Sequence, residues 1–282
     1  MNLENIYKTF YKVLQTLPDG PLFSKLEINP TELCNRTCSF CPRGQGYPNK
    51  NEHISLEVIN KIHDDLKELE YKGLIEICGS GEPLLSKNLL PLINKLKEFN
   101  LLMTTNGDRL TVKKIKELHK NGVNYFIVSL YDGEEQISDF KDKFLKANIS
   151  TDNYWLRKSW VEHDHFNNRA GSIGDYNKML ETTPCNILHY QLDVTINGNV
   201  EFCCHTAWKN DHYHGNILSS SLKEIWYGKK MQMYRKLLEK GRKHKPCKSC
   251  SVGGTRYGQE FVEKWNEVSK INNPEQSLKK TI

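Results

Sequence analysis

The sequence lacks the features that would assign it to several common protein classes. No apolar stretch approaches the roughly 20 residues that a membrane-spanning helix requires, and no secretory signal is recognisable. It has no internal repeat and no low-complexity tract. Charge of one sign is not abundant either, because 40 basic residues face 34 acidic ones, and a net charge of +6 does not by itself indicate nucleic-acid binding. We therefore expect a cytoplasmic protein that binds neither membranes nor nucleic acid.

Cysteine, in contrast, is plentiful and unevenly placed. The 282 residues contain nine cysteines, an odd number, and seven of them form two groups. In a reducing compartment, grouped cysteines are more often metal ligands than disulfides. The first group is Cys34, Cys38 and Cys41, and the second is Cys185, Cys203, Cys247 and Cys250.

Short apolar runs alternate with helical patterns through the first half of the chain. Such repeats of strand and helix predict parallel strands with right-handed crossovers, and so an α/β barrel or an open sheet. The 282 residues are enough for one full domain and a smaller second one, and the 38% of apolar residues is enough to form a core. The expected strands are residues 26–28, 74–78, 101–104, 125–130 and 154–156.

Polar and glycine-rich segments follow these strands. The first cysteine group follows the first strand, and Gly79-Ser80-Gly81-Glu82-Pro83 follows the second. Asn106 follows the third strand, and Ser129 lies near the end of the fourth. Ligands of parallel α/β folds bind at the carboxyl ends of the strands, so we expect these segments to form one site.

The first cysteine group has the spacing Cys-x3-Cys-x-Phe-Cys on a tight loop. Three thiolates can hold three irons of a [4Fe-4S] cluster and leave the fourth iron open for reaction. A structural zinc site fits this loop less well, because zinc usually takes four ligands, often in two Cys-x2-Cys pairs.

Cys34-x3-Cys38-x-Phe40-Cys41 resembles the motif of the radical SAM superfamily, and residues 79–83 resemble its second signature, GGEP, with Ser80 as the departure. The resemblance implies a partial TIM-type (β/α) barrel of five to six parallel strands. It also implies that the open iron binds S-adenosylmethionine (SAM), which one electron cleaves to methionine and a 5′-deoxyadenosyl radical that abstracts hydrogen from the substrate. The SAM-binding residues would be Phe40, Gly79, Ser80, Gly81, Glu82, Pro83, Asn106 and Ser129.

The second cysteine group resembles the SPASM and twitch domains of the same superfamily. A β-hairpin with an Asn197-Gly198 turn stands between Cys185 and the Cys247-x2-Cys250 pair, and no cysteine follows Cys250. This pattern resembles the shorter, twitch form with one auxiliary [4Fe-4S] cluster. Cys204 is the rival of Cys203 as a ligand, since neighbouring strand residues point to opposite faces.

The resemblance extends to twitch-containing dehydrogenases that oxidise an alcohol of an aminocyclitol. It implies two-electron oxidation of a small polar molecule, a sugar or cyclitol, with the second electron passing to the auxiliary cluster. Arg169 is a candidate for orienting the substrate or taking its proton, and a structural arginine at the domain junction is an equal alternative. A low-potential donor such as flavodoxin or ferredoxin would supply the first electron.

Two further interpretations stay open. The chain could be a SPASM-type enzyme that modifies a peptide or protein, or a zinc-binding module without catalytic activity. The expected organisation is an N-terminal helix (1–20), a radical SAM core (21–166), an auxiliary-cluster domain (167–258) and a C-terminal helix with a polar tail (259–282).

Overall fold

The alternating strands and helices of the sequence form one large sheet whose outer face is covered by helices. We analysed a computed structural model, which describes residues 9–11, 13–162, 167–174, 182–209 and 212–272. Six strands run parallel in the order β8-β3-β4-β5-β6-β7, which confirms the α/β class and the partial barrel. They are β3 (Lys25–Ile28), β4 (Leu74–Ile77), β5 (Asn100–Thr105), β6 (Val123–Leu130), β7 (Tyr154–Lys158) and β8 (Gln191–Val194).

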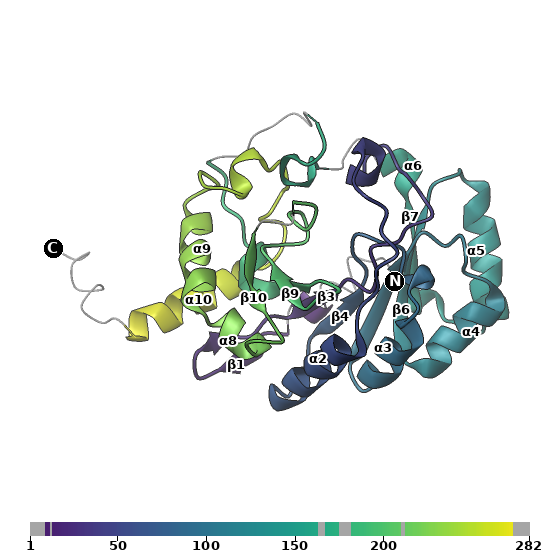
Figure 1. The fold of residues 1–282 in the computed structure, drawn as a ribbon. Helices are drawn as coiled ribbons and strands as arrows, with labels where there is room; N and C mark the ends of the chain where they lie inside the picture. The colour runs from purple at the N-terminus through teal and green to yellow at the C-terminus, as the bar shows by residue number, and fades with distance from the viewer. Residues whose placement is uncertain (1–8, 12, 163–166, 175–181, 210–211, 273–282) are drawn as a thin grey trace.

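The helices that follow these strands pack their apolar faces on the outside of the sheet (Figure 1). Ser55 and Thr111 cap α2 and α4 through their side-chain oxygens, as expected from the sequence. The helices are α2 (Leu56–Glu68), α3 (Leu89–Leu96), α4 (Val112–Asn121), α5 (Glu135–Lys146) and α6 (Ser159–Glu162). No described helix has both the length and the apolar composition that a membrane span needs.

The interior of the partial barrel is apolar at one end and polar at the other. Leu74, Leu102 and Ile127 point inward from three neighbouring strands and pack around Phe10, which plugs this end. Two residues further along β4, on the same face, Glu76 replaces the apolar side chains. The polar half of the interior therefore lies toward the carboxyl ends of the strands.

The N-terminal segment departs from the expected helix over residues 1–20. Residues 9–11 are helical, but β1 (Thr16–Leu17) and β2 (Gly20–Pro21) pair as short antiparallel strands. Pro18 has no backbone donor to continue a helix, and Gly20 has a φ of 131°, which only glycine adopts readily. The prediction was therefore wrong for residues 16–17 and 20, whereas residues 1–8 lie outside the described part.

The C-terminal half completes the sheet and builds a second layer beside it. β8 pairs with β3 and is the sixth parallel strand, which the sequence analysis did not predict. After β8, the chain passes through the Asn197-Gly198 turn into β9 (Asn199–Glu201), and β10 (Tyr213–Asn216) then pairs with β9. Figure 1 shows the remaining helices grouped beside this hairpin. They are α7 (Ile187–Tyr190), α8 (Leu222–Trp226), α9 (Lys229–Glu239) and α10 (Gln259–Asn272), with short 3-10 turns η5 (Arg169–Gly171) and η6 (Cys247–Ser249).

Candidate active site

The first cysteine group lies in the loop between β3 and α2. Cys34, Cys38 and Cys41 are all half-buried, and backbone hydrogen bonds from Cys41 N to Cys38 O (3.0 Å) and from Gly44 N to Cys41 O (2.9 Å) wind the loop tightly. The pKa of Cys38 is raised to about 11, chiefly by burial and in smaller part by repulsion from the neighbouring Cys41 and Cys34 thiolates. The three sulfurs thus face a common region where a cation would stabilise their thiolate forms.

Arg43 and Asn49 hold this loop in shape, and the sequence motif gave no signal for either. The buried Arg43 guanidinium donates to the carbonyl oxygens of Ser80 (Nε, 3.0 Å), Pro48 (Nη1, 2.8 Å) and Glu32 (Nη2). The Asn49 side chain accepts from Cys34 N and donates to Cys34 O, both at 2.9 Å. The arginine therefore fastens the cysteine loop to the Gly79–Gly81 turn.

The turn after β4 is packed against the start of the cysteine loop. Gly79 has a φ of 153°, and a Cβ there would overlap the Asn29 side chain. A Cβ on Gly81 would overlap the Thr31 carbonyl oxygen. Ser80 is buried and donates to Glu32 Oε1 (2.6 Å). Glycine is therefore needed here for close approach of backbone to backbone, and the serine adds a tie of its own.

Glu82 ties this turn to the next one. Its buried carboxylate accepts hydrogen bonds from Leu84 N (3.1 Å), Thr105 Oγ1 (2.5 Å) and Asn106 N (2.8 Å). Burial raises the pKa of Glu82, and these three bonds oppose the rise. Its contact with SAM stays a prediction, whereas the observed contacts show that it fixes the loop; Pro83 follows as the first residue of a 3-10 turn, η2 (Pro83–Leu85).

The loops that follow β5 and β6, at the carboxyl ends of the strands, also contact the cysteine loop. Arg36 forms ion pairs with Asp108 (2.6 Å) and Asp132 (2.7 Å). Its guanidinium lies 4.8 Å from the centre of the Tyr131 ring. Phe40 stacks on Tyr131, with ring centres 5.9 Å apart.

Two of the predicted SAM-binding residues at the strand ends make polar contacts of their own. Asn106 Nδ2 donates to Asn35 Oδ1 (2.8 Å) inside the cysteine loop. Ser129 is buried, and its hydroxyl accepts a hydrogen bond from Arg157 on β7. The structure thus brings the residues predicted for the first site to one rim, as expected from the strand order.

The second cysteine group surrounds one small cavity. Cys185, Cys203, Cys247 and Cys250 are all buried and line it together with Ala170, Ile187, Leu188, Phe202, His205, Thr206, Leu238, Arg242 and Val252. The pKa of Cys247 is raised to about 12, chiefly by burial and in smaller part by repulsion from Cys185 and Cys250, whereas Arg242 acts in the opposite direction. Four thiols therefore converge from three separate segments of the chain.

Cys204 faces a different cavity. The backbone N–H of Cys203 donates to Thr206 Oγ1 (3.0 Å), and Thr206 N donates back to Cys203 O (2.9 Å), so the chain turns there. Cys204 lines a second cavity with Glu27, Asp193 and the turn residues Gly79 and Ser80. The placement favours Cys203 over Cys204 as the partner of Cys185, Cys247 and Cys250.

The spacing of the sulfurs fits a cluster better than a single metal ion. Among the described residues, no three sulfurs of either group lie within 4.8 Å of one another. One zinc ion with bonds of about 2.3 Å would draw all its sulfurs closer than that. A cubane places each thiolate on its own iron and separates them, so both groups fit [4Fe-4S], with three ligands in the first and four in the second.

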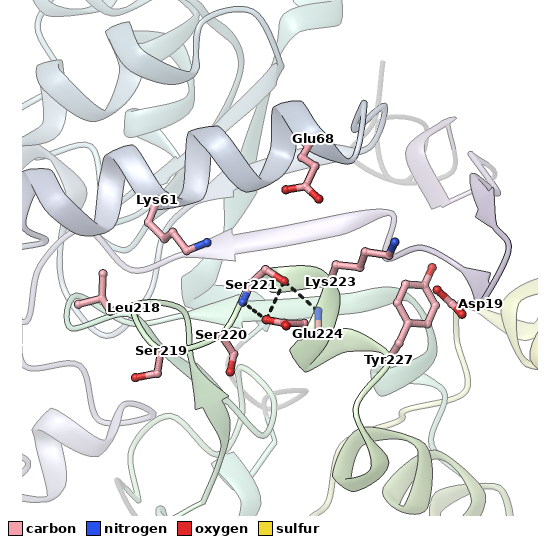
Figure 2. A pocket seen from close by; sticks show the side chains of 10 residues that line it. All are labelled: Asp19, Lys61, Glu68, Leu218, Ser219, Ser220, Ser221, Lys223, Glu224 and Tyr227. Carbon is pink, nitrogen blue, oxygen red and sulfur yellow. Dashed lines mark hydrogen bonds between the residues drawn. The ribbon is translucent and has the colours of Figure 1, made fainter.

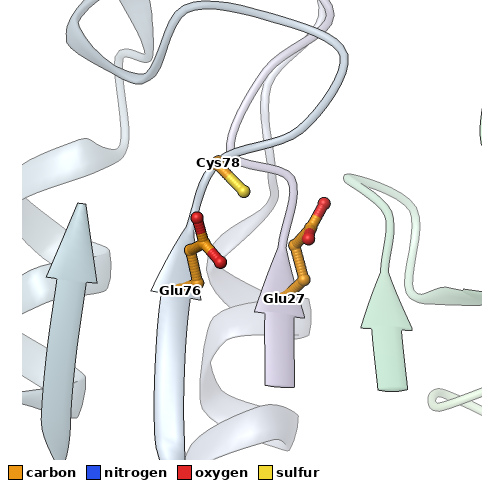
Figure 3. Close-up of side chains that lie close together, drawn as sticks. All are labelled: Glu27, Glu76 and Cys78. Atoms are coloured by element: carbon orange, nitrogen blue, oxygen red, sulfur yellow. The ribbon is translucent and has the colours of Figure 1, made fainter. Parts of the chain in front are cut away.

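A row of carboxylates crosses the barrel interior between the two cysteine groups. Glu27 lies beside Glu76 on one neighbouring strand and beside Asp193 on the other. Lys25 pairs with Glu76 (2.6 Å) and Glu27 (3.3 Å). Figure 3 shows Glu27, Glu76 and Cys78 directed toward one another. Burial raises the pKa of both Glu27 and Asp193, and their mutual repulsion adds to it at Asp193.

Arg169 lies where this interior meets the second cysteine group. Its backbone has a φ of 47°, a conformation that costs free energy in a residue with a side chain. Asn168 holds it there through hydrogen bonds with Ser249 O (2.6 Å) and Ser251 N (3.0 Å), on either side of Cys250. Arg169 Nε is buried without a hydrogen-bond partner among the described residues. The positive charge of Arg169 acts to lower the pKa values of Cys204 and His205.

A broad surface hollow between α2 and α8 is remote from this chemistry. Figure 2 shows Lys61 and Glu68 on one side and residues 218–221, Lys223, Glu224 and Tyr227 on the other. Ser221 and Glu224 there form the capping box that begins α8. Its lining contains no cysteine and no residue of the two cysteine motifs or of the Gly79–Pro83 turn.

Family models match both halves of this arrangement. The model of the radical SAM superfamily matches residues 28–157. The SPASM model, an iron-sulfur cluster-binding domain, matches residues 185–251. The chain belongs to the radical SAM superfamily. This confirms the predicted resemblance and its cofactors: SAM and [4Fe-4S] clusters, one of them auxiliary.

Individual relatives share the same organisation. The S-adenosyl-L-methionine-dependent 2-deoxy-scyllo-inosamine dehydrogenase of Niallia circulans is 27% identical over 242 residues, 82% of this chain and 93% of that protein. The crystal structure of BtrN in complex with AdoMet and 2-DOIA matches with a TM-score of 0.72 at 26% identity, over 82% of this chain and 94% of that one. A probable GTP 3′,8-cyclase of Archaeoglobus fulgidus is 41% identical, but over only 39% of this chain and 36% of its own. The protein is a radical SAM oxidoreductase.

Proposed function

We propose that this radical SAM enzyme is a dehydrogenase that oxidises a secondary alcohol of an amine-bearing cyclitol or sugar. The observation that carries the proposal is the cavity between the two cysteine groups. Gly79 and Ser80 of the SAM-binding turn line it on one side, and Cys204, next to Cys203, lines it on the other. The cavity measures only about 20 Å³, so a substrate would have to widen it, and it would then lie beside both proposed cofactor sites.

The charge of the cavity supports an amine on the substrate. Glu27, Asp193 and Glu32 line it, and Lys25 is the cation that pairs with the Glu27 and Glu76 carboxylates beside it. An ammonium group would offset the remaining negative charge in a region of low dielectric constant. The similarity to a 2-deoxy-scyllo-inosamine dehydrogenase over most of both chains points to the same substrate class.

In this proposal the cysteines hold the two clusters and the interior residues handle the substrate. Cys34, Cys38 and Cys41 would bind the open cluster, with Phe40, residues 79–83, Asn106 and Ser129 around SAM, and Cys185, Cys203, Cys247 and Cys250 would bind the auxiliary one. When bound, the clusters supply one-electron chemistry, in which SAM is cleaved reductively and the substrate radical loses its electron. A flavodoxin or ferredoxin would deliver the low-potential electron.

The chain's own residues would orient the alcohol and take its proton. Arg169 would donate a hydrogen bond to the substrate oxygen, because a guanidinium stays charged and does not act as a base. The single hydroxyl proton would pass to one carboxylate of the Glu27–Asp193 pair, whose pKa values are raised by burial. The barrel plug around Phe10 keeps water from the far end of the cavity.

The test is turnover of aminocyclitols by the anaerobically reconstituted enzyme. With 2-deoxy-scyllo-inosamine and its close analogues, we expect 5′-deoxyadenosine and a ketone in equal amounts. Formation of 5′-deoxyadenosine at the same rate with and without every candidate, and no ketone, would contradict the proposal.

A further inference from the structure

The auxiliary cysteine cavity contains a buried charge that the cysteine motif does not explain. Arg242 follows the end of α9 and lines the cavity with the four cysteines. Its side chain is among the largest that are completely buried, with a relative exposure of 1%. Burying a guanidinium is costly unless its charge and donors are compensated, so its position requires a partner.

The protein supplies only part of that compensation. Arg242 Nη2 donates to the carbonyl oxygen of Pro184 (3.2 Å). Its Nε and Nη1 are buried with no hydrogen-bond partner among the described residues. Two strong donors are therefore left over inside a cavity whose other polar atoms are chiefly thiols.

Gly254 brings the guanidinium and a cysteine sulfur together. A Cβ on Gly254 would lie 2.9 Å from Arg242 Nη2 and would overlap Cys185 Sγ. The backbone N–H of Asn186, next to Cys185, donates to the Gly254 carbonyl oxygen (2.8 Å) and holds residue 254 close to Cys185. The missing side chain at residue 254 thus allows one backbone position to touch both groups.

We propose that Arg242 is a positioning residue of the auxiliary cluster, whose free N–H groups donate hydrogen bonds to the cysteine sulfurs and whose charge raises the reduction potential of that cluster. Positive charge and hydrogen bonds to sulfur both favour the more negative, reduced state of an iron-sulfur centre. A higher potential would make the cluster held by these cysteines a better acceptor for an electron from the substrate side. The proposal rests on the auxiliary-cluster role of the cysteines, but it does not depend on the substrate.

A redox titration followed by electron paramagnetic resonance tests the charge effect on the full-length holoenzyme without substrate. The resonance signal of the auxiliary cluster is identified as the one that does not change when SAM is added. We expect Arg242→Gln to make the reduction potential of the auxiliary cluster more negative. At a fixed applied potential, the ratio of oxidised to reduced cluster should rise at least about tenfold, which corresponds to a shift of about 59 mV for one electron. Arg242→Lys keeps the charge and should shift it less. An unchanged potential in Arg242→Gln would overturn the proposal.

A second measurement does not depend on how well the glutamine variant assembles. Wild-type enzyme grown with guanidino-¹⁵N arginine should show ¹⁵N hyperfine coupling to the reduced auxiliary cluster in pulsed spectra. Arg242→Lys should abolish it. Arg235→Lys should not, because Arg235 is equally buried but stacks on Trp226 and Trp265 outside the cavity. Absence of coupling in the wild type, or its persistence in Arg242→Lys, would overturn the proposal.

Iron analysis separates this proposal from the one on which it rests. About four irons per chain instead of eight would mean that the auxiliary site is empty, and would overturn both. Eight irons without ¹⁵N coupling would overturn the role of Arg242 alone.

Discussion

Cys203 and Cys204 are neighbours in the sequence, but they line two different cavities. Cys203 faces Cys185, Cys247 and Cys250, whereas Cys204 faces Glu27 and Asp193 inside the barrel. This peptide unit therefore links the proposed electron acceptor to the proposed substrate cavity. The two cysteines also form a matched pair for mutation.

Cys203→Ser should lower the iron content, whereas Cys204→Ser should leave it unchanged. We expect the Cys203 variant to fall from about eight irons per chain to about four, because one ligand of the auxiliary cluster is lost. The Cys204 variant should keep about eight. Iron and sulfide analysis after anaerobic reconstitution measures both, and the reverse pattern would assign the ligand to Cys204.

Arg43→Lys should weaken SAM binding and destabilise the core. A lysine cannot reproduce the fork that reaches the Ser80, Pro48 and Glu32 carbonyl oxygens, so buried acceptors lose their donors at a cost of about 2–4 kcal/mol. Urea unfolding and SAM titration measure the two effects. Arg109→Lys is the control, because Arg109 is exposed and its replacement should cost much less. Equal losses in both variants would argue against a special role for Arg43.

Gly81→Ala should lower stability by about 1–3 kcal/mol through overpacking. The added methyl group would overlap the Thr31 carbonyl oxygen and push the turn away from the cysteine loop. Gly253→Ala is the matched control, because nothing lies within 4 Å of a Cβ there. Thermal unfolding of both variants measures the difference, and equal melting temperatures would show that the turn can move freely.

The strand–helix order and the rim could be predicted from the sequence because both depend on local pattern. Buried strands are recognisable in the sequence as apolar runs. Residues 34–41 come soon after β3, and residues 79–83 come soon after β4. β8 escaped prediction because Gln191 and Asp193 interrupt its apolar pattern; both are buried, and Asp193 lines the cavity beside Gly79 and Ser80. Arg43, Asn49 and Arg242 also escaped, since their roles depend on contacts between distant segments that no spacing reveals. The short strands at residues 16–21 replaced a helix because Pro18 and Gly20 set the backbone there.

Asp193→Asn should stabilise the protein at neutral pH. The pKa of Asp193 in the folded state is raised by burial and by Glu27, so folding binds a proton there, and stability is lost as the pH rises through that pKa. Asparagine removes this cost and can still accept the hydrogen bond from Gln191 Nε2 (2.7 Å).

Urea unfolding across pH tests the sign of this effect. The advantage of Asp193→Asn should be largest at neutral pH and should vanish at pH values below the ordinary pKa of aspartate. Asp139→Asn, which neutralises an exposed carboxylate paired with Lys143, is the matched control and should not stabilise the protein at neutral pH. An advantage that is constant across pH would mean that the Asp193 carboxylate is not the titrating group.

The most direct test of the central claim is the fate of the hydrogen on the alcohol carbon. Aminocyclitols deuterated at each ring carbinol, beginning with 2-deoxy-scyllo-inosamine, would be incubated with the reconstituted enzyme, SAM and a low-potential reductant. We predict one deuterium in 5′-deoxyadenosine for each ketone formed, from one position only. Deuterium transfer that yields an epimer or another redox-neutral product in place of a ketone would contradict the account.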